Sequence, residues 1–272
     1  MGGWGGTLRP SQGMSPITES AWLALALFGA MLLAHEGGRR VALRRQAASP
    51  DQARAGSGAI DAAVFGLLGL MIAFTFTSAA TRFERRRELV LQETNAIGTA
   101  WMRLDLLAKD QRAQEIQDVF RHYVDARIAV YKQLHSEQAL NTALREVGVR
   151  QQRLWALALQ ACERDPRPQT GMLVLPCLNE MFDLATARVA AGRTHVPAGI
   201  ILMLWLLAVV SALVAGNGQP IAQVRPWFQP LVFAFVTSLA LYATLDLEYP
   251  RMGLIRVDAA DRILLEVRES MK

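Results

Sequence analysis

Apolar and charged residues are distributed unevenly along this chain. Four stretches carry almost no charge, and they cover residues 21–34, 62–80, 196–224 and 226–245. A helix of about 20 apolar residues crosses the ~30 Å hydrocarbon core of a bilayer, and each stretch holds a window near that length. The pattern therefore predicts four membrane-spanning helices, at about 17–34, 60–80, 196–215 and 226–245. No segment shows sustained alternation of apolar and polar residues, so no sheet is expected.

The remaining segments predict how the chain is organised around these spans. Residues 1–16 are expected to form a disordered, glycine-rich tail, and residues 17–81 hold spans 1 and 2 joined by a basic, polar connector at 36–58. Residues 82–194 repeat apolar positions at helical spacing, which predicts an extramembrane helical module whose first helix continues from span 2 to about Leu107. Residues 195–249 hold spans 3 and 4, and residues 250–272 end in an amphipathic helix. The predicted fold class is all-α, a four-span membrane protein with a long-helix bundle between spans 2 and 3.

Composition and motifs narrow the possible functions. The chain is 52% hydrophobic with a net charge of +5, and its basic residues lie at span edges among acids, which does not favour nucleic-acid binding. It has no Walker loop, GxSxG elbow, HExxH or GxGxxG motif, so we expect neither an enzyme nor a cofactor or metal site. Cys162 and Cys177 flank a proline-rich turn, where a periplasmic module would allow a disulfide and a cytosolic one would keep two buried thiols. Arginines flank both sides of the membrane, so the charge rule leaves the orientation open.

The second span has two unlike faces when it is drawn as a helical wheel. One face is apolar throughout, whereas the other changes from apolar residues to hydroxyls and comprises Leu70, Phe74, Thr77, Ser78 and Thr81. The hydroxyls have two open interpretations. They bond to carbonyls of their own or a neighbouring helix, or they line a water-filled pore whose constriction is formed by Leu70 and Phe74. One helix cannot enclose a lumen alone, so the second interpretation requires an oligomer.

Charged residues at the ends of the spans are further candidates. Arg82, Arg85 and Arg86 follow the hydroxyl face and would raise the local concentration of anions at a pore mouth. Acidic residues near membrane depth are candidates for function by default, here Asp61, Asp246 and Glu248. All three lie near span ends, where helix capping or ion pairing is the alternative. Asp61 and Asp246 are expected on opposite membrane faces, so they should not form one site.

Several segments resemble a bacterial family of unknown function that is labelled bestrophin-like. They are Asp61–Leu70, Thr81–Arg86, Asn95–Trp101, Leu178–Met181 and Asp246–Arg251, and the resemblance covers roughly residues 58–270. A more distant resemblance to bestrophin ion channels rests on four spans, a helical insert after the second, and the second span itself. In bestrophins that span lines a narrow neck and ends in a Thr-Arg-aromatic run. Matching this run to Thr81–Phe83 places Gly66, Leu70 and Phe74 at the neck, with Gly66 departing from the bulky residue of the family.

The resemblance implies a homo-oligomeric membrane channel, pentameric and mostly anion-conducting, in the bacterial inner membrane. Its expected partners are the lipid bilayer, small ions and further copies of the chain. No segment matches the acidic calcium-binding cluster of animal bestrophins, so calcium gating is not implied. The alternative is a non-conducting membrane scaffold or sensor whose helical module binds a partner. The two differ in whether the hydroxyl face of span 2 turns toward a central axis or packs against the other spans.

Overall fold

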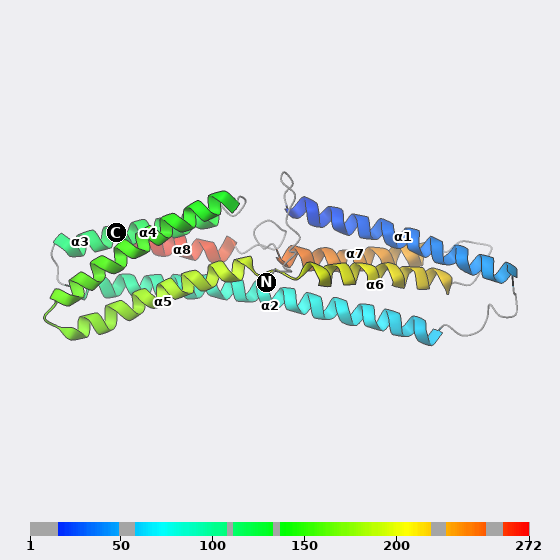
Figure 1. The fold of residues 1–272 in the computed structure, drawn as a ribbon, viewed down its shortest axis with the longest axis horizontal. Coiled ribbons are helices and arrows are strands. Elements are labelled where there is room, and N and C mark those ends of the chain that lie inside the picture. The colour runs from blue at the N-terminus through cyan, green and yellow to red at the C-terminus, as the bar shows by residue number, and fades with distance from the viewer. Residues whose placement is uncertain are drawn as a thin grey trace, which may run out of the picture. The chain divides into compact units, whose positions relative to one another are not determined.

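The computed structural model describes residues 16–48, 58–107, 111–132, 137–218, 227–248 and 258–271. Within these ranges the chain forms eight α-helices and no strand, as the predicted fold class requires (Figure 1). The predicted N-terminal tail lies outside the described residues, apart from its last position. The helices are α1 (Pro16–Ala48), α2 (Gly58–Leu104), α3 (Gln111–Lys132), α4 (Glu137–Arg164), α5 (Pro168–Arg193), α6 (Ala198–Asn217), α7 (Phe228–Glu248) and α8 (Asp258–Ser270).

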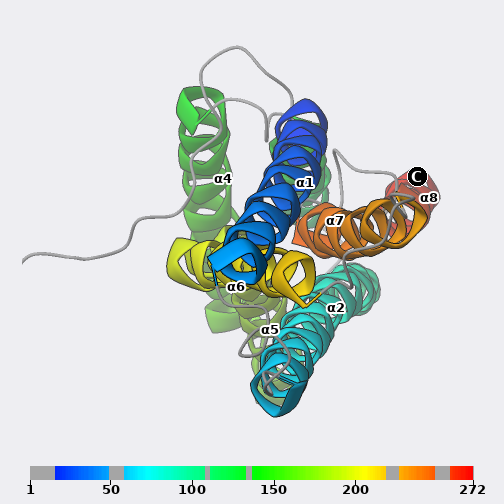
Figure 2. The ribbon, with the colours of Figure 1, turned by 90° about the vertical axis from the view of Figure 1, so that its right-hand side faces the viewer.

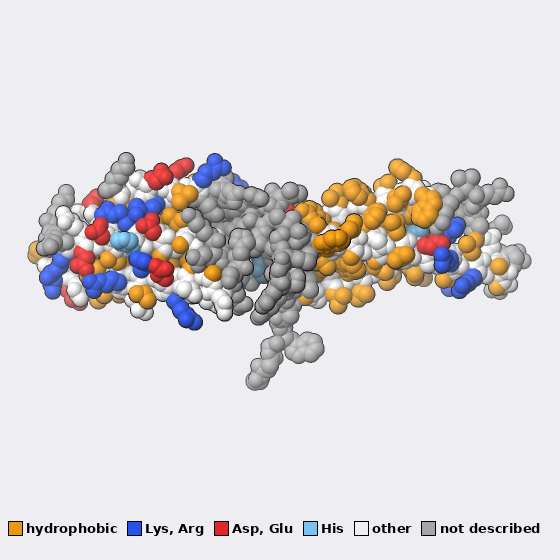
Figure 3. Space-filling model, turned by 90° about the horizontal axis from the view of Figure 1, so that it is seen from above, with side chains coloured by type: hydrophobic (Ala, Val, Ile, Leu, Met, Phe, Trp, Pro, Cys, Tyr) orange, Lys and Arg blue, Asp and Glu red, His pale blue; other side chains and the backbone are white. Residues whose placement is uncertain are grey.

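The chain divides into two compact units. Unit 1 comprises Met1–Phe83 and His195–Arg256, and unit 2 comprises Glu84–Thr194 and Val257–Lys272. Four helical segments are long and apolar enough to cross a membrane, and their most apolar windows are in α1, α2, α6 and α7. Hydrophobic side chains dominate the visible surface of the unit 1 helices, whereas charged side chains are spread over unit 2 (Figure 3). The protein is therefore a multi-pass helical membrane protein, as predicted.

The prediction of a polar connector directly after span 1 is wrong for the first part of that segment. Helix α1 does not end at Ala34 but continues through Gly37 and Gly38 to Ala48. Glu36 pairs with the next turn of the same helix, at 3.4 Å from Nε of Arg39 and 3.1 Å from Nε of Arg40. Such i,i+3 and i,i+4 pairs support a helix that composition alone does not favour.

A glycine of this segment, Gly38, allows a close crossing of α1 and α6. A Cβ placed on Gly38 would lie 2.0 Å from the carbonyl oxygen of Leu213 in α6, and one on Gly216 would lie 2.0 Å from the carbonyl oxygen of His35. Each helix thus brings a glycine against the backbone of the other. Small residues are what allow membrane helices to approach this closely.

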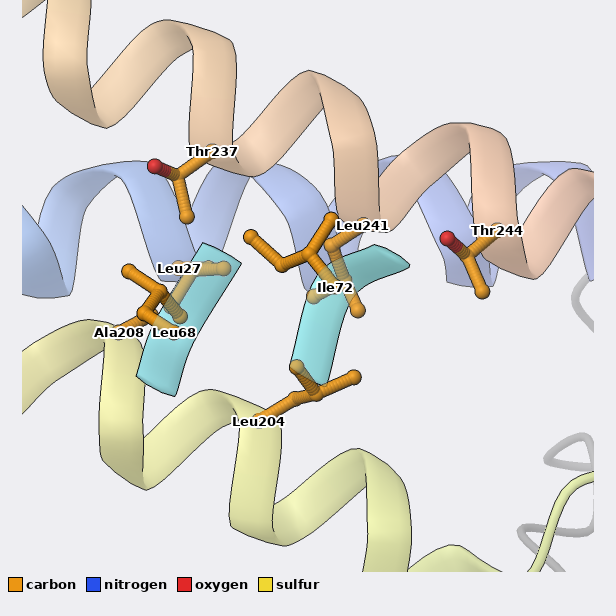
Figure 4. Close-up of a pocket in the computed structure, with 8 residues that line it drawn as sticks. All are labelled: Leu27, Leu68, Ile72, Leu204, Ala208, Thr237, Leu241 and Thr244. Carbon is orange, nitrogen blue, oxygen red and sulfur yellow. The ribbon is translucent and has the colours of Figure 1, made fainter. Parts of the chain in front are cut away.

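The core of unit 1 lies between its four helices, and Figure 2 shows α1, α6 and α7 grouped with α2 beside them. Its largest buried side chains include Leu27 and Met31 of α1, which meet residues of α2, α6 and α7. A cavity of about 10 Å³ remains there, room for about one water molecule. It is lined by Leu27, Leu68, Ile72, Leu204, Ala208, Thr237, Leu241 and Thr244 (Figure 4).

Unit 2 is a bundle of α3, α4, α5, α8 and the second half of α2. Its core includes Phe120 and Tyr123 of α3 together with Leu154, Leu178 and Met181 from α4 and α5. The C-terminal helix α8 belongs to this bundle, because Leu264 is buried in the core and Arg268 pairs with Asp125 of α3 through two bonds of 2.7 and 2.9 Å.

Both cysteines of unit 2 are free thiols. Cys162 on α4 lies opposite Gly171 on α5, whose added Cβ would be 3.6 Å from the Cβ of Cys162. Cys177 is six residues further along α5, a helical rise of about 9 Å, which exceeds the reach of a disulfide. Burial raises the pKa of both thiols, which disfavours the reactive thiolate.

Candidate pore face and its surrounding charges

The membrane-spanning part of α2 turns one face toward the other spans of the chain and the other face away from them. Leu68, Thr75 and Ala79 are buried on the inner face. The opposite side carries the predicted pore face, of which Leu70 is 49% exposed and Phe74 is 61% exposed, and all its members are exposed: Leu70, Phe74, Thr77, Ser78 and Thr81. In total, only 11% of the most apolar window of α2 is buried, against 50% for α7. The predicted pore face thus does not pack against the other spans of the chain.

The hydroxyls of this face are exposed although one of them also bonds within its own helix. Thr81 donates to the carbonyl oxygen of Thr77 at 2.9 Å, the local bond that was the alternative to a pore. On the inner face Thr75 makes the same kind of bond, to Met71 at 2.7 Å. A local bond satisfies the donor of a hydroxyl but leaves its oxygen able to accept further bonds, so it is compatible with either interpretation.

Helix α7 shows the reverse arrangement of polar and apolar residues. Its hydroxyl residues Thr237, Ser238 and Thr244 are buried inside unit 1. Apart from Gln229 in its first turn, its exposed residues are all apolar and comprise Phe228, Leu231, Val232, Phe235, Val236 and Leu239. This is the pattern of a helix that faces lipid, because hydrocarbon offers a hydroxyl no partner. The exposed face of α2 therefore differs in kind from the exposed face of α7.

Two of the three predicted pore-mouth arginines have partners elsewhere in the chain. Arg82 is only 26% exposed and bonds through Nε to Oε1 of Glu248 in α7 at 2.9 Å, with Nη2 2.8 Å from the same oxygen. Arg86 is buried and donates to the carbonyl oxygens of Ala191 and Thr194, at 3.2 and 2.6 Å. Those carbonyls end α5, where a cation is favourable. Neither arginine is therefore kept as a charge at a pore mouth.

Arg85 alone of the three points away from the core. Its Nη1 lies 2.9 Å from Oε2 of Glu88, one turn further along α2, and the two side chains are 54% and 55% exposed. Gln92 donates to the other oxygen of Glu88 at 2.9 Å. The outward surface of α2 beyond the hydroxyls thus carries a paired arginine and glutamate.

The acidic candidates occupy different ends of unit 1. Asp61 lies in the first turn of α2, close to Gly218 at the end of α6. Asp246 and Glu248 are buried near the C-terminus of α7, where Glu248 accepts a bond from the backbone N–H of Val196 at 3.2 Å, just before α6 begins. Glu248 also lies 3.6 Å from Nδ1 of His195. It thus ties the start of α6 and the helices α2 and α7 together, and ion pairing is the alternative named for it above, although its partner Arg82 was not predicted.

A buried charge network in unit 2 was missed by the sequence reasoning. Glu93 of α2 is fully buried and bonds to Nε of Arg127 at 2.7 Å and to Nη1 of Arg188 at 2.7 Å. The hydroxyl of Tyr131 donates to Glu93 at 3.1 Å. The guanidinium of Arg188 lies over the ring of Tyr131, 3.6 Å from the ring centroid. One feature of the sequence could have revealed this network. Glu93 is four residues from both Leu89 and Ile97, so the three share one face of α2, and both apolar neighbours are buried.

The electrostatics of this network favour the ionised carboxylate. Burial alone would raise the pKa of Glu93, but attraction to Arg127 and Arg188 outweighs it and holds that pKa below its ordinary value. Burial raises the pKa of Tyr131, so its hydroxyl stays protonated and able to donate. One acid between two arginines fits a structural clamp joining α2, α3 and α5. Within the described ranges, no group of three or more metal-ligating side chains gathers.

Comparison with known proteins identifies the fold. No protein-family model and no curated protein sequence matches the chain. Among solved structures, the chain is similar to crystal structures of variants of a bacterial bestrophin homolog from Klebsiella pneumoniae. One has a TM-score of 0.61 at 14% identity over 90% of this chain and 97% of that chain. A second has a TM-score of 0.60 at 15% identity over 90% and 99% of the two chains. A third has a TM-score of 0.57 at 15% identity over 90% and 98%. The chain therefore has a bestrophin-like fold along nearly its whole length.

Proposed function

We propose that this chain is one subunit of a homo-oligomeric ion channel of the bacterial inner membrane. In this proposal the exposed face of α2 lines a water-filled lumen, and anions are the first candidate ions. The bestrophin-like fold supports the class of protein, because bestrophins conduct ions through a pore lined by the corresponding span.

The observation that carries the proposal is the exposure of hydroxyls on α2. Thr77, Ser78 and Thr81 lie on the outside of the subunit, whereas α7 buries its serine and threonines and, beyond Gln229 in its first turn, exposes apolar residues. A row of hydroxyls is unfavourable against lipid and favourable against water or another polar surface. The surface that this part of α2 meets is thus expected to be wet.

An oligomer follows from the geometry of one helix. A single α2 presents one strip of side chains and cannot surround a lumen, so copies related by a rotation axis must supply the rest. Bestrophins use five copies, and we adopt that number for this chain. Leu70 and Phe74 would then form two apolar rings one helical turn apart, which precede the hydroxyls along α2.

Such rings restrict flow by excluding water from a narrow passage. Replacing Phe74 with alanine removes the larger of the two side chains, so Phe74→Ala should widen the constriction and raise the single-channel conductance. Purified protein in planar bilayers gives this measurement directly. Phe235→Ala is the matched control, because Phe235 of α7 is 58% exposed, much like Phe74, but lies on the face assigned to lipid.

Three results would overturn the proposal. These are a protein that stays monomeric in lipid nanodiscs, the absence of current from both the wild type and Phe74→Ala, and equal effects of the two phenylalanine variants. A stable oligomer without conductance would favour the scaffold or sensor, because the exposed hydroxyls would then be covered by protein.

A further inference from the structure

The charges that follow the hydroxyl face on α2 are arranged as a pair. Helix α2 runs without interruption from Gly58 to Leu104. At 100° per residue, Arg85, Glu88 and Gln92 lie within about 40° of the direction of Thr81. The first charges beyond the hydroxyls on this face are thus one arginine and one glutamate.

Contacts inside the subunit hold this pair in place. Arg85 lies 2.9 Å from one carboxylate oxygen of Glu88, and Gln92 donates to the other oxygen at 2.9 Å. Of the neighbouring arginines, Arg82 is bound to Glu248, Arg86 is buried at the end of α5, and Arg87 lies 3.6 Å from an oxygen of Glu84. The exposed positive and negative side chains of this turn of α2 therefore carry no net charge.

We infer that the Arg85–Glu88 pair sets the ratio of anion to cation permeability, by holding this ring of the channel close to electroneutral. The inference rests on the proposed channel function and adds to it the residues that decide ion selectivity. An unpaired arginine in each subunit would favour anions at the mouth, and an unpaired glutamate would favour cations. With both present, the wild type should discriminate weakly by charge.

The expected size of the effect follows from Coulomb's law and screening. For five charges roughly 10 Å from the axis in water, removing one partner should change the local ion concentration about threefold at 0.15 M salt. The same change should reach about tenfold at 0.01 M salt, where the Debye length is longer. The effect is therefore best resolved at low ionic strength.

Reversal potentials in planar bilayers with asymmetric KCl test the inference. Glu88→Gln should move the reversal potential toward the chloride equilibrium potential, and Arg85→Gln should move it toward that of potassium. The double variant should return close to the wild-type value. Both positions are exposed, and exposed pairs contribute little to stability, so the variants should fold.

A second pair on another helix provides the control. Arg150 and Glu146 of α4 are separated by 2.6 Å and are also solvent-accessible, at 34% and 55%. Glu146→Gln removes the same charge from a helix other than α2 and should leave the reversal potential unchanged.

The outcomes separate the two levels of the proposal. Currents whose reversal potential is the same in wild type, Arg85→Gln and Glu88→Gln would overturn this inference and leave the channel intact. Shifts in the same direction for both variants, or an equal shift for Glu146→Gln, would also overturn it. Absence of current from every protein would refute the channel itself and the inference with it.

Discussion

The close crossing of α1 and α6 gives a prediction whose size can be worked from the structure. A methyl group on Gly216 would sit 2.0 Å from the carbonyl oxygen of His35 and 3.0 Å from the backbone nitrogen of Arg39. Both obstacles are backbone atoms within a helix, so neither can rotate away as a side chain would. The Gly216→Ala variant therefore has to push the helices apart by about 1 Å to reach an allowed contact.

Separation of that size weakens the contacts on both sides of the crossing. A radial gap of 0.5–1 Å forfeits roughly a quarter to a half of each dispersion contact, and overpacking typically costs about 1–3 kcal/mol. Alanine favours a helix by about 1 kcal/mol over glycine where space is open. Gly199 of α6 and Gly29 of α1 have open space at the Cβ position, so Gly199→Ala and Gly29→Ala are matched controls that should gain stability.

The variants are compared by thermal unfolding of the purified protein in detergent, which is monitored through the loss of its monodisperse peak. Gly216→Ala should unfold roughly 5–10 °C below Gly199→Ala, at about 2–4 °C per kcal/mol. Gly38→Ala should behave alike, because its methyl would meet the carbonyl of Leu213 at the same crossing. The double variant should cost less than the sum, since helices already parted have room for the second methyl. Equal stability of Gly216→Ala and its control would refute the close approach, and strict additivity would refute the shared crossing.

Two further predictions concern the buried charges, and those for Phe74 and for the Arg85–Glu88 pair are given above. Glu93→Gln leaves two buried arginines without their anion and should cost about 3–5 kcal/mol, whereas Glu115→Gln removes only an exposed partner of Arg153 and should be nearly neutral. Because the pKa of Glu93 in the folded protein lies below its ordinary value of 4.5, its stabilisation is present above pH 4.5 and is lost as the pH falls through the lowered pKa. The gap in melting temperature between wild type and Glu93→Gln should therefore narrow in acid, and a gap that stays constant at low pH would contradict this account. Arg82→Gln leaves the buried Glu248 without its main cation and should lower stability by about 2–3 kcal/mol in the same melting assay, while Arg87→Gln, which loses only an exposed 3.6 Å contact with Glu84, serves as control. Equal melting temperatures for these two variants would count against the role of Glu248 in joining α2 and α7.

The sequence by itself determined that the fold is helical and where its apolar spans lie, although it placed the end of α1 too early. Charge-free windows mark where α1, α2, α6 and α7 cross, because hydrocarbon excludes charge and length is dictated by bilayer thickness. The helical spacing of apolar residues over 82–194 predicted a helical bundle, and apolar residues of these helices, among them Phe120, Leu154 and Leu178, form its buried core. These properties are local, so they can be read from neighbours in the chain.

The tertiary structure alone decided which helices meet and which charges are paired. A polar connector was expected from residue 36, but α1 continues to Ala48 and meets α6 at the close approach of Gly38 and Gly216. The partners of Arg82 and Glu93 lie 166 and 34 residues away, and no local pattern links a charge to a partner so distant. Periodicity predicts the direction in which a side chain points, whereas the group that it meets depends on how separate helices pack.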